Sequence, residues 1–185
     1  SPQRNPGGVL VPQTEKGLTG KGFEFLAEME RMHMIVDVSH LSDKGFWDIV
    51  EHGTRPFAAS HSNCRALAPH TRNLTDEMIR ALSERGGIAG LNYYAPFLDT
   101  DPTHPENCRS TVEMIAKHAA HYKQVGGAQM IALGSDFDGI DGPHQLENAA
   151  FLPLLADALR KESFTEDEVE GIYYRNAMRF FEENL

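Results

Sequence analysis

Residues 34–40 spell MIVDVSH, a run of β-branched and apolar residues that ends in a histidine, His40. A second run of the same character, PFAASHSN at residues 56–63, leads into His61. Segments that are apolar on both faces are typical of strands in a parallel sheet that helices cover. The two stretches therefore predict two neighbouring parallel strands, each with an imidazole at its carboxyl end.

A helix pattern precedes the first of these strands. The segment 19–33 places Phe25, Met29 and Met32 at i, i+4 and i+7, and Leu26 widens the stripe. This spacing predicts a helix that buries the face carrying these four residues.

Further helices and strands follow the second stretch. Two more strands are predicted, GIAGLNYY at 87–94 and QMIALGSDFDG at 129–139. Capping residues predict where helices begin: Ser42, Thr75, Ser110 with Glu113 as a capping box, and Thr165 with Glu168 as a second box.

The order strand then helix, repeated four times, predicts an α/β fold with about four parallel strands and covering helices. Residues 1–17, rich in Pro and Gly, are expected to form an arm or loop, and residues 18–185 one domain. An open doubly wound sheet and a (β/α)8 barrel both fit this order. No GxGxxG or Walker A pattern follows a strand, so nothing favours a nucleotide site.

The composition is that of a soluble globular chain, with 185 residues and 41% hydrophobic residues. Its formal net charge of -10 argues against nucleic acid or an anionic membrane as a partner. Two separated cysteines outside any CxxC pattern predict no disulfide framework and a cytoplasmic location. No apolar run approaches the roughly 20 residues of a membrane span.

Polar residues follow all four predicted strands. His40 and His61 end the first two, residues 92–94 (NYY) end the third, and Asp136 and Asp138 follow the fourth. Functional groups of parallel α/β folds lie at the carboxyl ends of the strands. The sequence therefore predicts a site along this one edge.

The two strand-end histidines form a candidate metal site. Imidazole suits zinc, and side chains from strands about 4.8 Å apart can converge on one ion. Solvated histidines and an Asp-rich turn at Asp136 remain the alternative. Arg72, on the loop after the second strand, is a candidate clamp for a substrate carboxylate, or an ordinary surface arginine.

Five segments together resemble the membrane (renal) dipeptidases, a family of zinc-dependent dipeptidases: MIVDVSHLS, PFAASHSN, HTRNLTDE, GIAGLNYY and IALGSDFDG. Their order matches that family. So do the 21-residue step from His40 to His61 and the 11-residue step from His61 to Arg72. The resemblance runs from about Gly17 to the end of the chain.

The resemblance implies a (β/α)8 barrel with a two-zinc centre that hydrolyses dipeptides, often with a D-residue on the C-terminal side, and sometimes β-lactams. It implies that His40 and His61 are ligands of one zinc ion. It implies that Arg72 holds the terminal carboxylate of the substrate, and that Asp136 meets the substrate and assists proton transfer.

Other family features have no counterpart in this sequence. There is no HxD pair and no Glu-Gly-Gly, since the Gly-Gly pairs follow Pro6, Arg85 and Val125. Four strands are half of the eight that a closed barrel needs. We therefore expect the C-terminal half of a dipeptidase barrel, incomplete and inactive alone, whether truncated, proteolysed or split. A second copy or a separate N-terminal half-barrel is the expected partner.

Two other functions remain open at this point. The chain could be a non-catalytic binding or scaffold domain that keeps the dipeptidase fold without its chemistry. It could also be an unrelated open α/β binding protein.

Overall fold

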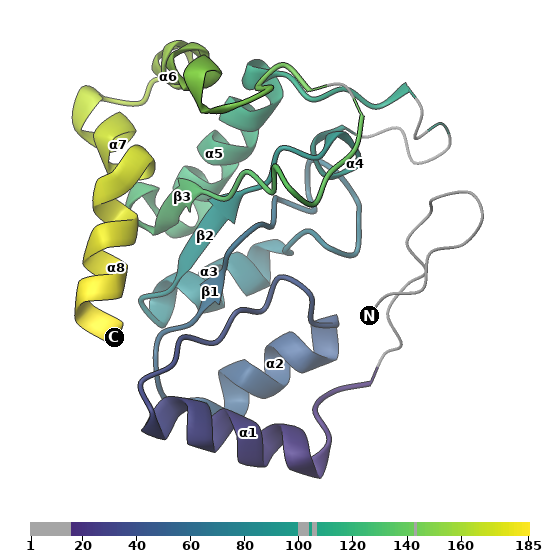
Figure 1. Cartoon of the computed structure of the whole chain (residues 1–185), viewed down its shortest axis with the longest axis vertical. Helices are drawn as coiled ribbons and strands as arrows, with labels where there is room; N and C mark the ends of the chain where they lie inside the picture. The colour runs from purple at the N-terminus through teal and green to yellow at the C-terminus, as the bar shows by residue number, and fades with distance from the viewer. Residues whose placement is uncertain (1–15, 100–103, 105–106, 143) are drawn as a thin grey trace.

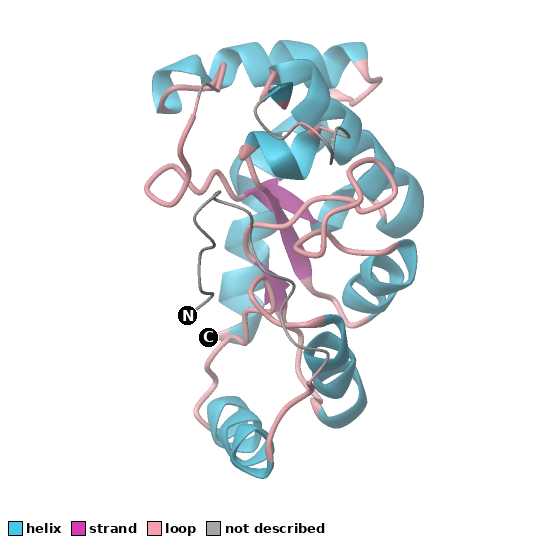
Figure 2. Ribbon diagram, turned by 90° about the vertical axis from the view of Figure 1, so that its right-hand side faces the viewer, coloured by secondary structure: helices cyan, strands magenta, loops and turns pink. Residues whose placement is uncertain are grey.

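The computed structural model describes residues 16–99, 104, 107–142 and 144–185 as a small parallel sheet with helices packed around it (Figures 1 and 2). The elements are, in chain order, α1 (Gly20–Arg31), α2 (Asp43–His52), β1 (Ala58–Ala59), α3 (Asp76–Glu84), β2 (Ile88–Leu91), α4 (Ala95–Leu98), α5 (Val112–Gly126), the 3₁₀ helix η2 (Ala128–Met130), β3 (Ile131–Leu133), the 3₁₀ helix η3 (Ala149–Phe151), α6 (Leu152–Lys161), α7 (Glu166–Glu170), the π-helix η4 (Gly171–Arg175) and α8 (Asn176–Asn184). No helix within those ranges is long and apolar enough to cross a lipid bilayer. The predicted arm lies outside the described residues, except for its last two.

The three strands pair in the order β1-β2-β3, and both pairings are parallel. Ala89, in the central strand, pairs with Ala59 on one side and with Ile131 on the other. Helices α3 and α5 connect the successive strands, as parallel pairing requires. The predicted α/β class and parallel sheet are confirmed, and the carboxyl ends of the strands lie at one edge.

The first predicted strand is reduced to an isolated bridge between Asp37 and Ala58. Val38 N donates to Ala58 O at 2.8 Å, but the ladder then stops. Ser60 N donates to Asp37 Oδ1 at 2.9 Å, and Val38 O accepts a hydrogen bond from Leu41 N. Both groups that would continue the ladder are thus engaged elsewhere, so the described sheet has three strands and not the predicted four.

Two glycines allow a close approach at the carboxyl edge. A Cβ on Gly90 or on Gly134 would collide with the backbone carbonyl oxygen of Ser60. Ser62 N also donates to Gly90 O at 3.0 Å. Because neither glycine has a side chain, the end of β1 lies directly against β2 and β3, and this contact sets the position of His61.

The sheet has a core on each face. The larger core lies on the face of the sheet that packs against α3 and α5. It includes Ala59, Ala89, Ile131, Ile79, Leu82, Ile115 and Tyr122. On the other side a small cluster joins the sheet to α8: Ala58, Ile88, Ala132 and Phe180. The alternation of strand side chains between two faces thus fixes the positions of both helical layers.

Helix α8 crosses the amino ends of the strands (Figure 1). Arg179 Nη2 donates to Gln129 O at 2.8 Å, just ahead of β3. Arg55 Nη2, ahead of β1, donates to Asn184 O at 2.7 Å. The amino edge of the sheet is therefore covered by α8, on the side away from the strand-end histidines.

The predicted helix caps at Ser42, Thr75 and Thr165 are confirmed, and Thr165 forms the predicted capping box with Glu168. The predicted cap at Ser110 is wrong by one residue, because Thr111 accepts the hydrogen bond from Met114 N. The backbone of Ser110 pairs instead with the segment at His144.

The predicted buried face of α1 is wrong. Leu26 is buried, but Phe25 and Met32 are 69% and 57% exposed. Glu30, one turn after Leu26, accepts hydrogen bonds from Thr54 N and Arg55 N at 2.8 and 3.0 Å. These two hydrogen bonds of Glu30 determine which face of α1 packs against the protein, and that face cannot be predicted from the spacing of apolar residues alone.

His118 is buried in α5, although it is a polar residue on a helix that also carries exposed side chains. Its Nδ1 accepts from Cys64 N, and its Nε2 donates to Leu98 O, both at 3.1 Å. Burial lowers the pKa of His118 to about 4. The neutral imidazole thus joins α5 to α4 and to the loop after β1.

We expect the Gly90→Ala variant to lose at least about 2 kcal/mol of unfolding free energy, because the added methyl group overpacks against a backbone that cannot yield. Urea unfolding followed by circular dichroism measures this loss. Gly20→Ala is the control, since a Cβ on Gly20 meets no atom within 4 Å. Equal midpoints for the two variants would contradict the close approach.

Acid should destabilise the fold through His118. The unfolded state takes up a proton near pH 6.5 and the folded state near pH 4, so stability falls as the pH drops between these values. The difference corresponds to about 3 kcal/mol. His118→Gln should remove this part of the pH slope, measured by urea unfolding from about pH 7 to 4, although its stability at neutral pH is lower. An unchanged slope in His118→Gln would contradict the assignment.

Candidate functional site

Two imidazoles meet at the carboxyl edge of the sheet. His40 follows the bridged segment at Asp37, and His61 follows β1. Their Nε2 atoms are 2.9 Å apart, and the ring centroids are 4.9 Å apart at 55°. The structure thus brings together the two histidines that the sequence placed at successive strand ends.

The surroundings of this pair favour neutral rings. Partial burial and then the positive charge of Arg72 lower the pKa of His40. Burial is also the largest influence on His61 and lowers its pKa, with Asp136 opposing the shift and Arg72 adding to it. A neutral imidazole with a free nitrogen lone pair is the form that binds a metal ion.

The pair fits a metal ion of the zinc type. Two ligand nitrogens at about 2.0–2.1 Å from a tetrahedral zinc lie about 3.3 Å from one another. The observed 2.9 Å between the Nε2 atoms is close to this spacing. Within the described ranges, no group of three or more His, Cys, Asp or Glu side chains forms a metal cluster, so these residues present two imidazole ligands.

Arg72 lies near the histidines, and one of its buried nitrogens has no partner among the described residues. Its Nε donates to Ser39 O at 2.5 Å, and its guanidinium carbon is 5.2 Å from the ring centre of Phe97. Its Nη2 is buried and has no hydrogen-bond partner among the described residues. A buried guanidinium nitrogen without a partner is costly, and an anionic ligand would satisfy it.

Asp136 lies in the turn after β3 with a left-handed backbone, at φ 69°. Asn92 Nδ2 donates to Asp136 Oδ2 at 3.1 Å, and Tyr94 N donates to Asn92 Oδ1 at 2.7 Å. The second bond fixes which end of the Asn92 amide faces Asp136. Asp138, the other acid of the predicted pair, is exposed two residues further on.

Three buried asparagines hold the loops of this edge together, and the sequence pattern alone does not indicate them as a group. Asn63, Asn73 and Asn92 are all 0% exposed. Asn63 Oδ1 accepts from Asn92 N at 3.0 Å, and Asn63 Nδ2 donates to Asn92 O at 2.9 Å. Asn73 Oδ1 accepts from Asn63 N at 3.2 Å. The available signal was their position beside candidate residues, since Asn73 follows Arg72 directly.

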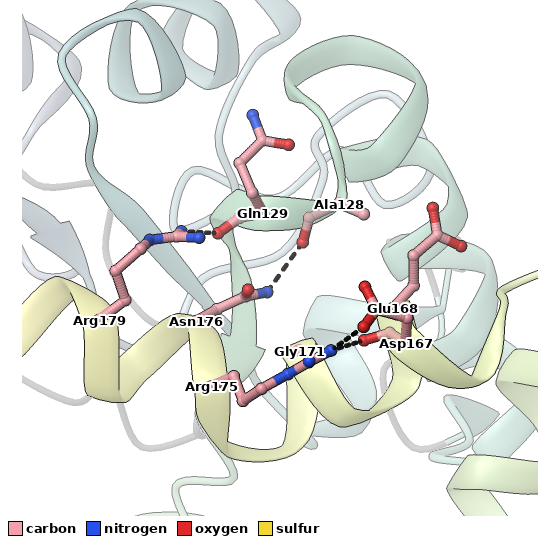
Figure 3. Close-up of a pocket in the computed structure, with 8 residues that line it drawn as sticks. All are labelled: Ala128, Gln129, Asp167, Glu168, Gly171, Arg175, Asn176 and Arg179. Atoms are coloured by element: carbon pink, nitrogen blue, oxygen red, sulfur yellow. Dashed lines mark hydrogen bonds and ion pairs between the residues drawn. The ribbon is translucent and has the colours of Figure 1, made fainter.

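A hollow of about 510 Å³ lies at the amino ends of the strands beside α8 (Figure 3). Its lining residues are Ala128, Gln129, Asp167, Glu168, Gly171, Arg175, Asn176 and Arg179. Arg175 pairs with Asp167 at 2.6 Å, Arg179 donates to Gln129 O, and Asn176 Nδ2 donates to Ala128 O at 2.9 Å. These polar groups are engaged with one another, so the candidate site stays at the opposite edge.

Known proteins resemble most of this chain. A protein in the pqqA 5' region of Klebsiella pneumoniae, itself uncharacterised, is 38% identical over 168 residues. An uncharacterised dipeptidase of Schizosaccharomyces pombe is 34% identical over 167 residues. The chain spans 61% and 39% of the lengths of these two relatives.

Solved structures resemble it over the same extent. The crystal structure of dipeptidase AC, a metallopeptidase of family M19, superposes on 94% of this chain with a TM-score of 0.86 and 33% identity. A metallopeptidase from Rhodobacter sphaeroides, bound to a phosphinate mimic of L-Ala-D-Ala, superposes with a TM-score of 0.85 and 32% identity. The chain covers 51% and 49% of these two structures.

The model of one protein family, described as membrane dipeptidase (peptidase family M19), matches residues 5–184. Because this match extends over nearly the whole sequence, the chain belongs to the membrane dipeptidase family.

Proposed function

We propose that this chain supplies the C-terminal half of a (β/α)8 barrel and part of the active site of a zinc-dependent dipeptidase. One observation carries the proposal: the facing Nε2 atoms of His40 and His61 lie near Arg72, whose Nη2 has no partner among the residues that the structure describes. A metal-ligand pair next to an anion site is what hydrolysis of a short peptide with a free carboxylate requires.

His40 and His61 would hold one zinc ion through their Nε2 atoms. Bound there, zinc would supply Lewis acidity and an activated water for attack on a peptide carbonyl. The two imidazoles already face each other, and the hydrogen that their 2.9 Å contact requires, on His40 Nε2 when His61 Nε2 is bare, would leave as the ion binds.

Arg72 would receive the terminal carboxylate of the substrate. Ser39 and Phe97 hold its guanidinium in place, and its Nη2, which has no hydrogen-bond partner among the described residues, would bind the ligand. A carboxylate held at a fixed distance from the scissile bond would restrict cleavage to the last peptide bond of a short peptide. The phosphinate mimic of L-Ala-D-Ala bound by the Rhodobacter sphaeroides relative supports this substrate class.

Asp136 would move the proton. Asn92 occupies its Oδ2, which leaves Oδ1 to take a proton from the attacking water and to return it to the leaving amine. Its position on the same edge as the histidines supports this role.

The activity would need groups from outside this chain. A two-metal hydrolase needs more ligands than two imidazoles. We propose that an N-terminal half-barrel, or a second copy of this chain, completes the site. The coverage of about half of the two solved M19 structures supports the first of these.

Zinc binding tests the metal site directly. We expect the purified chain to bind one zinc ion per molecule, and His40→Ala to bind at least about 10-fold more weakly, because a direct ligand is lost. Competition with a chromogenic chelator measures both affinities. His52→Ala, an exposed histidine of α2, should bind like the wild type. Absence of zinc binding by the wild-type chain would favour a non-catalytic half-barrel that keeps the fold alone.

Carboxylate recognition tests Arg72. We expect the zinc-loaded chain to bind the phosphinate mimic of L-Ala-D-Ala, and Arg72→Met to bind it about 10- to 100-fold more weakly, since a charge-assisted hydrogen bond is worth about 1.5–3 kcal/mol. Calorimetry measures both affinities. The same ligand with an amidated C-terminus is the matched control and should not distinguish the two proteins. Equal binding of the free acid by both would remove Arg72 from the site.

A further inference from the structure

We propose that Asp37 and Ser60 are positioning residues that fix the tautomer of His61 and turn its bare Nε2 towards the metal position. This inference deepens the proposed function and rests on it. Neither side chain has a role in the metal, carboxylate or proton chemistry proposed above.

A continuous set of hydrogen bonds joins the three side chains. Asp37 Oδ1 accepts from the backbone N–H groups of Ser39 and Ser60, at 3.2 and 2.9 Å. Asp37 Oδ2 accepts from Ser60 Oγ at 2.5 Å. Ser60 Oγ lies 2.7 Å from His61 Nδ1. The carboxylate is therefore held by two backbone donors, and the serine hydroxyl lies between it and the imidazole.

The positions of the protons follow from the donors and acceptors in this set. An ionised carboxylate only accepts hydrogen bonds, so the single hydroxyl hydrogen of Ser60 points at Asp37. The oxygen of Ser60 then offers only lone pairs to His61, and Nδ1 of His61 must be the donor. A neutral imidazole with hydrogen on Nδ1 carries none on Nε2.

The bare nitrogen is the one that faces the site. His61 Nε2 lies 2.9 Å from His40 Nε2 at the carboxyl edge. The opposite tautomer would place an N–H there, and a protonated nitrogen cannot bind a metal ion. Partners on the far nitrogen of metal-bound histidines commonly contribute 10- to 100-fold in metal affinity, and here a hydroxyl lies between the carboxylate and the ring.

The hydrogen bonds that link Asp37, Ser60 and His61, here called the relay, also explain why the pairing of the Asp37 segment with β1 ends early. The hydrogen bond from Ser60 N to Asp37 Oδ1 takes the donor that a longer strand pairing would use. The Ser60 N–H that does not take part in strand pairing instead holds the Asp37 carboxylate, and this keeps Asp37 Oδ2 next to the Ser60 hydroxyl.

Asp37→Asn should reverse the donor and acceptor roles of the hydrogen bonds that link residue 37, Ser60 and His61. The amide oxygen must stay at the Oδ1 position, because two backbone N–H groups donate to it. The amide nitrogen then takes the Oδ2 position and donates to Ser60 Oγ. The Ser60 hydrogen turns to His61 Nδ1, which becomes an acceptor and moves the ring proton to Nε2.

The first measurement is the tautomer of His61 in the metal-free chain at about pH 8, where imidazoles are neutral. Long-range ¹H–¹⁵N correlation spectra report which ring nitrogen carries hydrogen, and the His61→Gln spectrum identifies the signal. We expect the Nδ1–H form in the wild type, a mixture in Ser60→Ala, and the Nε2–H form in Asp37→Asn. The conservative Ser60→Thr keeps the hydroxyl and should keep the wild-type form. A wild-type Nε2–H form, or the same tautomer in all variants, would overturn the proposal.

The second measurement is zinc affinity. Ser60→Ala and Asp37→Asn should each bind zinc 10- to 100-fold more weakly, with Ser60→Thr near the wild type. The control is Ser83→Ala, which removes a hydroxyl that donates to Gly126 O between α3 and α5. Circular dichroism verifies that every variant is folded.

The two measurements separate the proposals. Wild-type zinc binding that neither variant weakens would overturn the positioning role and leave the metal site standing. A wild type that binds no zinc would overturn the metal site, and the tautomer spectra would still decide whether Asp37 and Ser60 set the ring proton.

Discussion

The pairing of the Asn63 side chain with the backbone N–H and C=O of Asn92 holds the carboxyl edge of this sheet together. One amide accepts from Asn92 N and donates to Asn92 O, as a neighbouring strand would. Asn73 continues the contact towards Arg72, and the Asn92 side chain continues it towards Asp136. The three asparagines are buried, where an unpaired polar atom costs about 1–3 kcal/mol, so the loops that they join cannot shift independently.

The two edges of the sheet are used in opposite ways. At the amino edge, α8 covers the strand ends, and arginines such as Arg175 and Arg179 already have protein partners (Figure 3). At the carboxyl edge, Arg72 keeps a buried donor without a partner among the described residues, and two imidazole nitrogens face one another. Satisfied polar groups stabilise a fold, whereas unsatisfied ones at a fixed place are available to a ligand. Ligand binding and catalysis are therefore expected at the carboxyl edge.

The sequence was sufficient to predict the parallel α/β class, most helix starts and the edge that carries His40, His61, Arg72 and Asp136. Those features depend on local pattern and on a general rule of parallel sheets. Other features depend on partners distant in the sequence. His118 is buried because Cys64 and Leu98 supply a donor and an acceptor, and α1 is rotated because Glu30 meets Thr54 and Arg55. No window of sequence contains those contacts.

The contact between Arg55 and Asn184 joins residues 129 positions apart. During synthesis the amino end of β1 stays uncovered until α8, which contains Asn184, has been made. A growing chain thus holds a partly assembled parallel sheet whose apolar inner residues, Ala58 and Ile88, remain in water until Phe180 arrives. Intermediates with exposed apolar strands aggregate readily. Because α8 covers one face of the sheet and is made late, we expect the growing chain to need chaperones while it is still on the ribosome.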